Sequence, residues 1–187
     1  MKELIVDEDI RLIPVRLSDT EELFALVDDD RDRLRQWLPW VDGTKQVQDT
    51  TQFIQSSIDK NNAKNGYDCG IWFQGQLAGI IGLHGIQRQN RNSSIGYWLH
   101  RDKAGHGIMT RATRAMVQHL FEVEQITRVE ITCATENHRS QAIPLRLGAR
   151  REGIRRQCEW LYDHFVDHVV YSILAEEWPE YKPEQRG

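Results

Sequence analysis

The stretch from residue 96 to residue 110 reads GYWLHRDKAGHGIMT, and it decides the expected fold. It begins with the aromatic and aliphatic residues of a strand that we expect to span 94–99. Gly105 and Gly107 then predict a tight turn, and apolar residues at helical spacing begin at Ile108. The first amides of a helix have no partner within the helix and together carry about half a positive charge. A strand, a glycine turn and a helix in this order therefore predict a loop that binds a phosphate or pyrophosphate.

The same loop differs from two common nucleotide-binding motifs. Thr110 stands where a Rossmann fingerprint would have its third glycine, and no Gly-Lys-Ser/Thr follows at the Walker A spacing. A Gly-x-Gly pair before a helix also occurs simply as a turn. The loop alone therefore leaves both a ligand-binding role and a purely structural role open.

Outward from this loop, strand-like and helix-like segments alternate. Besides 94–99, the expected strands span 9–16, 69–73, 77–83, 128–133, 151–157 and 166–174, and the expected helices begin near Ser18 or span 51–60, 108–121 and 137–147. Strands that precede and alternate with helices indicate a mixed α/β fold in which helices pack on a sheet. The length of 187 residues fits one domain over 1–187, with a loosely ordered tail after about residue 178.

A second segment, from residue 136 to residue 148, reads ENHRSQAIPLRLG. Asn137 follows a strand, Ser140 lies near the start of a short helix, and Gly148 is a good helix terminator. Pro144 is expected to be tolerated only if that helix starts late, because proline breaks helix interiors. On structural grounds alone, Asn137 and Ser140 are helix caps.

The composition argues against several classes of protein. The formal net charge of −4 disfavours non-specific nucleic-acid binding, and no apolar run approaches the roughly 20 residues of a membrane span. Cys69, Cys133 and Cys158 lack CxxC spacing, which disfavours a disulfide framework and a structural zinc site. The N-terminal pattern is not that of a secretory signal, so we expect a cytoplasmic protein with reduced thiols. His164 and His168 lie four apart but in a β-like segment, so we expect no metal site.

Together, the two segments resemble the GNAT acetyltransferases. The spacing Asn137-x-x-Ser140-x-x-Ile143-x-x-Arg146-x-Gly148 is similar to the family's second motif, and the glycine loop resembles its acetyl-CoA motif. More narrowly, the Gly-x-Gly-Ile-Met pattern, the segment RQWL at 35–38 and the ending at 171–178 resemble the ribosomal-protein-serine acetyltransferases, which modify protein N-termini. The resemblance covers nearly the whole chain. It implies the GNAT fold, acetyl-CoA as co-substrate, acetyl transfer to an amine, and a homodimer.

The resemblance also implies which residues bind the co-substrate. The pantetheine arm is expected along the strand end at Trp98, Leu99 and His100. The pyrophosphate is expected on the amides of Gly105, His106, Gly107, Ile108, Met109 and Thr110. Asn137 is expected to hold a pantetheine amide. Ala104 departs from the Gln or Arg that the family usually has in this loop, a change that removes a side-chain contact but no backbone amide.

For the chemistry, the resemblance implies three groups. A backbone N–H near Trp98 or Leu99 is expected to polarise the thioester carbonyl. Ser140 is expected to hydrogen-bond the sulfur and to protonate the departing thiolate. Glu159 is expected to act as the base. For Glu159 the alternative is a plain surface position on a strand.

The acceptor is expected to be a protein N-terminus. A chain-terminal amine has a pKa of about 7.7 against about 10.4 for lysine, so its deprotonation costs about 3.7 kcal/mol less near neutral pH. A site with a modest base would therefore favour an α-amine. The alternatives are a polyamine, an amino acid, an antibiotic or another small amine, and, from a different class, a non-catalytic acyl-CoA sensor. Trp37 and Trp40 are expected in the core or at a dimer interface rather than against a substrate.

Overall fold

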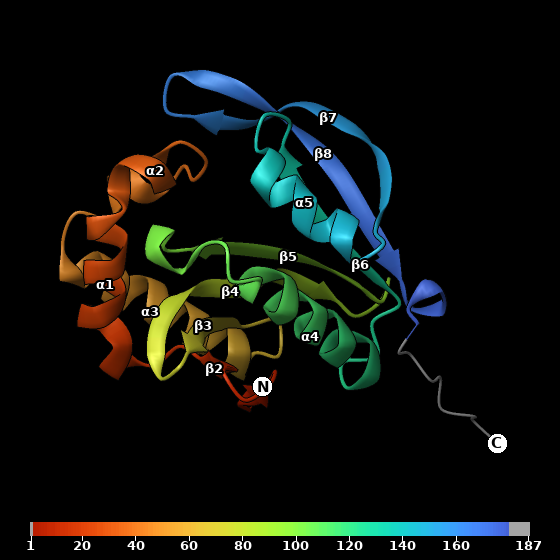
Figure 1. Cartoon of the computed structure of the whole chain (residues 1–187), viewed down its shortest axis with the longest axis horizontal. Coiled ribbons are helices and arrows are strands. Elements are labelled where there is room, and N and C mark those ends of the chain that lie inside the picture. The colour runs from red at the N-terminus through yellow and green to blue at the C-terminus, as the bar shows by residue number, and fades with distance from the viewer. Residues whose placement is uncertain (1, 180–187) are drawn as a thin grey trace.

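A computed structural model of the chain describes residues 2–179 (Figure 1). The strands are β1 (Leu4–Ile5), β2 (Ile10–Pro14), β3 (Asp68–Phe73), β4 (Gln76–Gln87), β5 (Asn92–Leu99), β6 (Arg128–Ala134), β7 (Arg150–Leu161) and β8 (His164–Leu174). The α-helices are α1 (Thr20–Asp29), α2 (Arg31–Arg35), α3 (Val47–Asn62), α4 (Ile108–Glu122) and α5 (His138–Arg146). The expected mixed α/β fold is confirmed. The tail predicted after about residue 178 lies, from residue 180 onward, outside the described residues.

The strands form one eight-stranded sheet in the order β1-β2-β3-β4-β5-β6-β8-β7. Neighbouring strands are antiparallel except β5 and β6, which run parallel because α4 connects them as a crossover. No helix within residues 2–179 is long and apolar enough to cross a membrane.

Helices cover both faces of this sheet, and Figure 1 shows α4 and α5 in front of it. Adjacent strand residues point to opposite faces, so Ile81 packs in the cluster that contains α4 and Ile80 packs against α1 and α3. In α4, Met116, Leu120 and Phe121 are fully buried. Each such side chain contributes about 2 kcal/mol through burial, which fixes where the N-terminus of α4 points.

The sheet splits at its parallel pair. Pairing between β5 and β6 ends at Ile95 and Ile131. Beyond that point β5 continues along β4 as far as Leu99, and β6 continues along β8 as far as Ala134. Two strand edges that are neighbours in the sheet therefore separate, and their main-chain groups lack a strand partner there. We call this opening between residues 96–99 and 132–134 the slot.

One helix prediction was wrong. Pro144 lies inside α5, which begins at His138, so the helix does not start late. Proline has no N–H to donate to the carbonyl four residues earlier, which here belongs to Ser140. The hydroxyl of Tyr97 donates to that carbonyl instead, at 3.1 Å. The lost helical hydrogen bond is thus replaced by one from β5, which ties α5 to the edge of the slot.

Candidate active site

A cavity of about 590 Å³ opens at the slot. Its wall combines the edges of β5 and β6 with residues of α1, α3, α5, β3, β4, β7, β8 and the segment between α2 and α3. Trp98, Asn137, Ser140 and Glu159, which were predicted from motifs in separate parts of the chain, all line it. Leu99, His100 and the glycine loop are not part of this wall.

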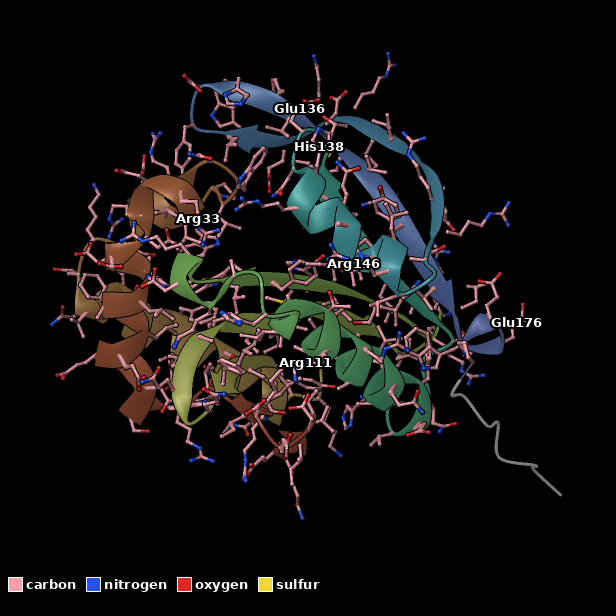
Figure 2. All side chains as sticks on the ribbon, viewed as in Figure 1. Arg33, Arg111, Glu136, His138, Arg146 and Glu176 are labelled. Carbon is pink, nitrogen blue, oxygen red and sulfur yellow. The ribbon has the colours of Figure 1, made fainter. Side chains whose placement is uncertain are left out.

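Main-chain groups of β5 face the slot at alternate residues. The N–H of His100 donates to the carbonyl of Ala78 on β4 at 2.8 Å. Because hydrogen-bonded pairs alternate along an antiparallel ladder, Trp98 also bonds β4, whereas Tyr97 and Leu99 turn their main-chain groups toward the slot. The carbonyl of Leu99 already accepts from the guanidinium of Arg33, which Figure 2 shows on α2 beside the end of β5. The N–H of Leu99, rather than that of Trp98, is therefore the slot-facing donor near the strand end.

His100 does not contribute a side chain to the slot. It is 4% exposed, its Nε2 lies 3.0 Å from Asp29, and its Nδ1 accepts from the N–H of Asp102. Among residues 2–179, Asp29, His100 and Asp102 form the one grouping with metal-ligand spacing. Arg101 donates to Asp29 at 2.8 Å, so this grouping is held by hydrogen bonds and an ion pair that cap the turn at Arg101–Lys103. We therefore assign it a structural role.

The glycine loop presents free amides. Gly105 and Gly107 adopt φ values of 89° and 68°, a left-handed region that favours glycine, and Gly107 caps α4. Within residues 2–179, the amides of 105–110 donate to no backbone or side-chain acceptor. The side chains of Ile108 and Met109 are buried and anchor the first turn of α4. A Cβ at either glycine would meet nothing within 4 Å, so the loop has room for an oxyanion to approach its amides.

Neighbouring side chains hold this loop in place. The ring of His106 stacks on Phe73, with ring centroids 6.0 Å apart. Arg111, labelled on α4 in Figure 2, donates to Asp7 at 2.7 Å and to the carbonyl of His106 at 3.3 Å. Ala104 uses its N–H to close the preceding turn on the carbonyl of Arg101. The amides, rather than side chains, are thus the part of the loop that suits a diphosphate.

Ser140 lies at the α5 side of the slot. Its N–H donates to the side-chain oxygen of Asn137 at 3.1 Å, so Asn137 caps α5 and keeps its side-chain NH₂ as a donor. The hydroxyl of Ser140 donates to the sulfur of Cys133 at 3.2 Å and lies 3.5 Å from the hydroxyl of Tyr97. Burial raises the pKa of both Tyr97 and Cys133, so both stay protonated at neutral pH. Sequence motifs identified Ser140 but missed the two groups that orient it.

Glu159 lines the same cavity as Ser140, from the β7–β8 hairpin. Its carboxylate lies 3.2 Å from Nε2 of His168, and the two side chains are 28% and 17% exposed. Glu159 follows an irregularity in the β7–β8 register, between Arg155 and Glu159. His164 pairs instead with Asp163, so these two histidines do not share a site. Glu159 is therefore a half-buried carboxylate in the cavity rather than a plain surface residue.

Three further polar residues of the cavity have no motif around them. The ammonium of Lys60 lies 2.6 Å from Asp68 and donates to the carbonyl of Leu83 at 2.9 Å. His84 completes the set from β4. The available signal was weak: His84 is a polar residue within the otherwise apolar run at 77–86.

Two tryptophans also reach the cavity. Trp37 and Trp40 line it, and the rings of Trp40 and Trp98 lie 6.1 Å apart at 51°. Trp40 is 38% exposed, so it is not a core residue, and its expected alternative position at a dimer interface stays a prediction. The hairpin closes above this region, since the hydroxyl of Tyr162 donates to the carbonyl of Leu38 at 2.6 Å.

The chain matches the Acetyltransferase (GNAT) domain family over residues 9–150, and it belongs to this family. It is therefore an acetyl-CoA-dependent acyltransferase. It is 32% identical over 174 residues to YdaF of Bacillus subtilis (strain 168), a provisionally named ribosomal N-acetyltransferase, covering 92% of this chain and 95% of that one.

Two solved structures share the fold closely. One is RimL, a ribosomal L7/L12 alpha-N-protein acetyltransferase in complex with coenzyme A, with TM-score 0.90 and 26% identity over 92% of this chain and 98% of that one. The other is the microcin C7 self-immunity acetyltransferase MccE in complex with acetyl-CoA and AMP, with TM-score 0.87 and 27% identity over 90% and 94% of the two chains. The resemblance inferred from the two motifs is thus confirmed.

Proposed function

We propose that this enzyme transfers the acetyl group of acetyl-CoA to the α-amine of a protein N-terminus. The observation that carries the proposal is the single cavity that Glu159 and Ser140 both line at the slot. A base is needed on the acceptor side and a proton donor on the sulfur side, and these two residues provide them. The likeness to RimL, a ribosomal-protein acetyltransferase, supports the choice of acceptor.

In this mechanism the pantetheine arm lies in the slot along Tyr97 and Leu99, and the diphosphate lies on the amides of 105–110. The N–H of Leu99 polarises the thioester carbonyl as negative charge develops on its oxygen. Glu159 accepts a proton from the attacking nitrogen as the C–N bond forms. The C–S bond then breaks, the hydroxyl of Ser140 gives its proton to the leaving sulfur, and the proton held by Glu159 restores the Ser140 hydroxyl through solvent. Asn137 donates its side-chain NH₂ to a carbonyl of the arm.

The balance of charge in the cavity supports a cationic acceptor. Lys60 and Asp68 neutralise each other, which leaves the carboxylate of Glu159 as the charge that an ammonium would meet. An α-ammonium also loses its proton about 3.7 kcal/mol more readily than a lysine does. A cavity with one half-exposed carboxylate is therefore better matched to an α-amine than to a lysine side chain.

The proposal is tested with a pair of peptides of the same sequence, each starting with serine and containing one internal lysine. One has a free N-terminus and the other a formylated N-terminus. Mass spectrometry after incubation with acetyl-CoA is expected to find one acetyl group on the N-terminus of the free peptide and none on the blocked peptide. Acetylation of the lysine in both peptides would overturn the proposal.

A second candidate acceptor is a small amine that carries a planar ring. Trp37, Trp40 and Phe53 give the cavity aromatic surfaces on which a ring can stack. The similar MccE structure is a complex with acetyl-CoA and AMP. Acetylation of an amine-bearing nucleotide, with no acetylation of the free peptide, would favour this candidate over a protein N-terminus.

The proposal extends to the domain organisation, the oligomeric state and the cellular location of the enzyme. We propose one GNAT domain over 1–187, because a single sheet runs from β1 to β7. We propose a homodimer, because Ile154, Trp160 and Phe165 on the β7–β8 hairpin are 48%, 54% and 55% exposed. A ribosomal-protein acceptor would place the enzyme in the cytoplasm.

A further inference from the structure

Acetyl transfer to an ammonium requires more than one proton transfer. The nitrogen loses one proton before it has a lone pair for attack, and it loses another as the tetrahedral intermediate becomes a neutral amide. One of these protons is balanced by the proton that the leaving sulfur gains, and the other is released to solvent. Glu159 can take one of the two. The cavity therefore needs either a second group that accepts a proton, or a base that releases its first proton before it accepts the second.

His84 is positioned in the cavity wall by the strand on which it lies. Between the register pairs Leu83↔Ile95 and Ile86↔Ser93, His84 and Gly85 oppose a single residue of β5, which is a β-bulge. Gly85 has φ 151°, consistent with the irregular backbone of a bulge. Bulges re-aim side chains, and here the side chain reaches the cavity.

Two glycines make room for the ring. Gly82 and Gly96 are opposite each other in the β4–β5 register. A Cβ at Gly96 would lie 2.4 Å from Nε2 of His84, and a Cβ at Gly82 would lie 1.9 Å from a carboxylate oxygen of Asp68. The imidazole and the carboxylate thus occupy the space that side chains at Gly96 and Gly82 would need. Gly96 is also the first slot residue of β5, so the ring lies at the end of the slot opposite to Leu99, in the cavity that Glu159 lines.

The ring is free to act on a ligand. Within residues 2–179 no hydrogen bond holds either nitrogen of His84, whereas the other histidine of the cavity, His168, is paired with Glu159. His84 is exposed, and its side chain lines part of the cavity. It can therefore accept a proton from a molecule in the cavity.

Titratable groups from three elements act on this ring, and one from a fourth lines the same cavity. Asp68 on β3 and Glu159 on β7 favour its protonated form, Lys60 on α3 opposes it, and His168 on β8 is the partner of Glu159. Burial among protein atoms is the largest influence, and it lowers the pKa of His84 from its usual value. The ring is therefore neutral near pH 7 and able to accept a proton. Asp68 and Glu159 favour the imidazolium that forms, although Lys60, which is paired with Asp68, opposes it.

We propose that His84 is a second catalytic residue, which accepts the proton that the acceptor ammonium loses before attack. The ammonium N–H bond breaks, its electron pair stays on nitrogen, and the proton binds an imidazole nitrogen. Glu159 then accepts the second proton as the C–N bond forms. His84, which is open to the cavity, returns its proton to solvent. This inference rests on the proposed acetyl transfer to an amine, but it does not depend on which amine is the acceptor.

The test compares wild-type enzyme with His84→Gln and His84→Ala, and uses His164→Gln as the matched control. His164 is an exposed histidine on the β7–β8 hairpin that pairs with Asp163. Formation of acetylated acceptor is measured from about pH 5 to pH 9, a range in which a histidine changes charge. We expect kcat of His84→Gln to fall about 100-fold, with the KM for acetyl-CoA unchanged. The acidic limb that reports a histidine should disappear from its pH profile, while His164→Gln keeps the wild-type profile.

Chemical rescue separates catalysis from structure. Added imidazole should restore part of the activity of His84→Ala, because the removed ring leaves room for it beside Gly96. A wild-type kcat and pH profile in His84→Gln, alongside a large loss in Glu159→Gln, would overturn the role of His84 and leave the acetyltransferase function intact. If the wild-type enzyme acetylates only a small amine, the acceptor proposal is wrong. The variants are then compared on that amine, where the same loss is expected.

Discussion

The two ends of the candidate active site, of which the cavity is one part, are built in different ways. The co-substrate end uses main-chain groups from one continuous stretch: the edge of β5 and the free amides before α4. The acceptor end uses side chains from separate elements, namely Lys60, Asp68, His84, Glu159 and His168. Main-chain groups remain when side chains change, so Ala104 can replace a larger residue while the amides stay in place. Substitutions at the acceptor end, by contrast, change the chemistry directly.

The largest effect is expected at the acceptor end. Glu159→Gln keeps the size of the side chain but removes the base, so kcat should fall about 1000-fold with little change in the KM for acetyl-CoA. Steady-state kinetics with the peptide acceptor measure both constants. Glu176→Gln is the control, since Glu176 is exposed on the turn after β8 and labelled at the far end of the molecule in Figure 2. Equal activity of the two variants would remove Glu159 from the mechanism.

Ser140→Ala tests the sulfur side of the slot. Without the hydroxyl the thiolate leaves unprotonated, so kcat should fall about 100-fold. The loss should shrink for thioesters whose thiols are more acidic, because those leave more easily without a proton. Ser18→Ala, on the short 3-10 turn before α1, serves as the control. A loss in kcat that is independent of thiol acidity would show that Ser140 does not protonate the sulfur.

Gly107→Ala tests the role of the main chain at the co-substrate end. An alanine at φ 68° is strained by about 1–2 kcal/mol, and relief of that strain moves the amides that follow. The KM for acetyl-CoA should rise about tenfold while kcat changes little. Gly75→Ala carries a similar strain, at φ 77° in the β3–β4 turn, and likewise meets nothing within 4 Å. A rise in KM in both variants would mean that it reflects general destabilisation rather than the loop.

Tyr97→Phe should have a smaller effect. It removes the donor to the carbonyl that Pro144 leaves unpaired, at a cost of about 1 kcal/mol in unfolding free energy. Because that carbonyl belongs to Ser140, kcat should also fall about fivefold, the rate equivalent of about 1 kcal/mol. Tyr171→Phe removes a hydroxyl that donates to Gln141 at 3.0 Å and should lower stability alone. Urea titrations measure the unfolding free energy of the two variants, and steady-state kinetics measure their kcat. An equal fall in kcat in both variants would contradict this account.

The smallest effect concerns the scaffold of the hairpin that carries Glu159. Hydrogen bonds from Arg128 and Ser172 lower the pKa of Glu152 from 4.5 to about 2. A carboxyl whose pKa is lower in the folded state stabilises the protein above its unfolded pKa, and this stabilisation is lost as the pH falls toward about 2. Glu152→Gln should therefore lower Tm by a few degrees at neutral pH. The difference should vanish near pH 2, and an equal difference at both pH values would contradict the assignment.

Sequence reasoning predicted the local main-chain structure of the two motifs correctly. The glycine turn before Ile108 and the Asn137-to-Ser140 spacing are each contiguous in the chain, so their motifs are recognisable from the order of residues alone. Pro144 was misjudged because its missing hydrogen bond is replaced by Tyr97, which lies 47 positions earlier in the chain. His84 and Asp68 were missed because strand pairing, a bulge and two glycines bring them to the cavity. No spacing between neighbouring residues in the sequence indicates those contacts.

Isothermal titration with acetyl-CoA tests the central claim that main-chain groups bind the co-substrate while separate side chains act on the acceptor. Wild-type enzyme and Glu159→Gln should bind acetyl-CoA with the same affinity, Gly107→Ala should bind it about tenfold more weakly, and NADP should give no heat. Absence of acetyl-CoA binding to the wild-type protein, or an affinity that falls in Glu159→Gln and not in Gly107→Ala, would contradict the account.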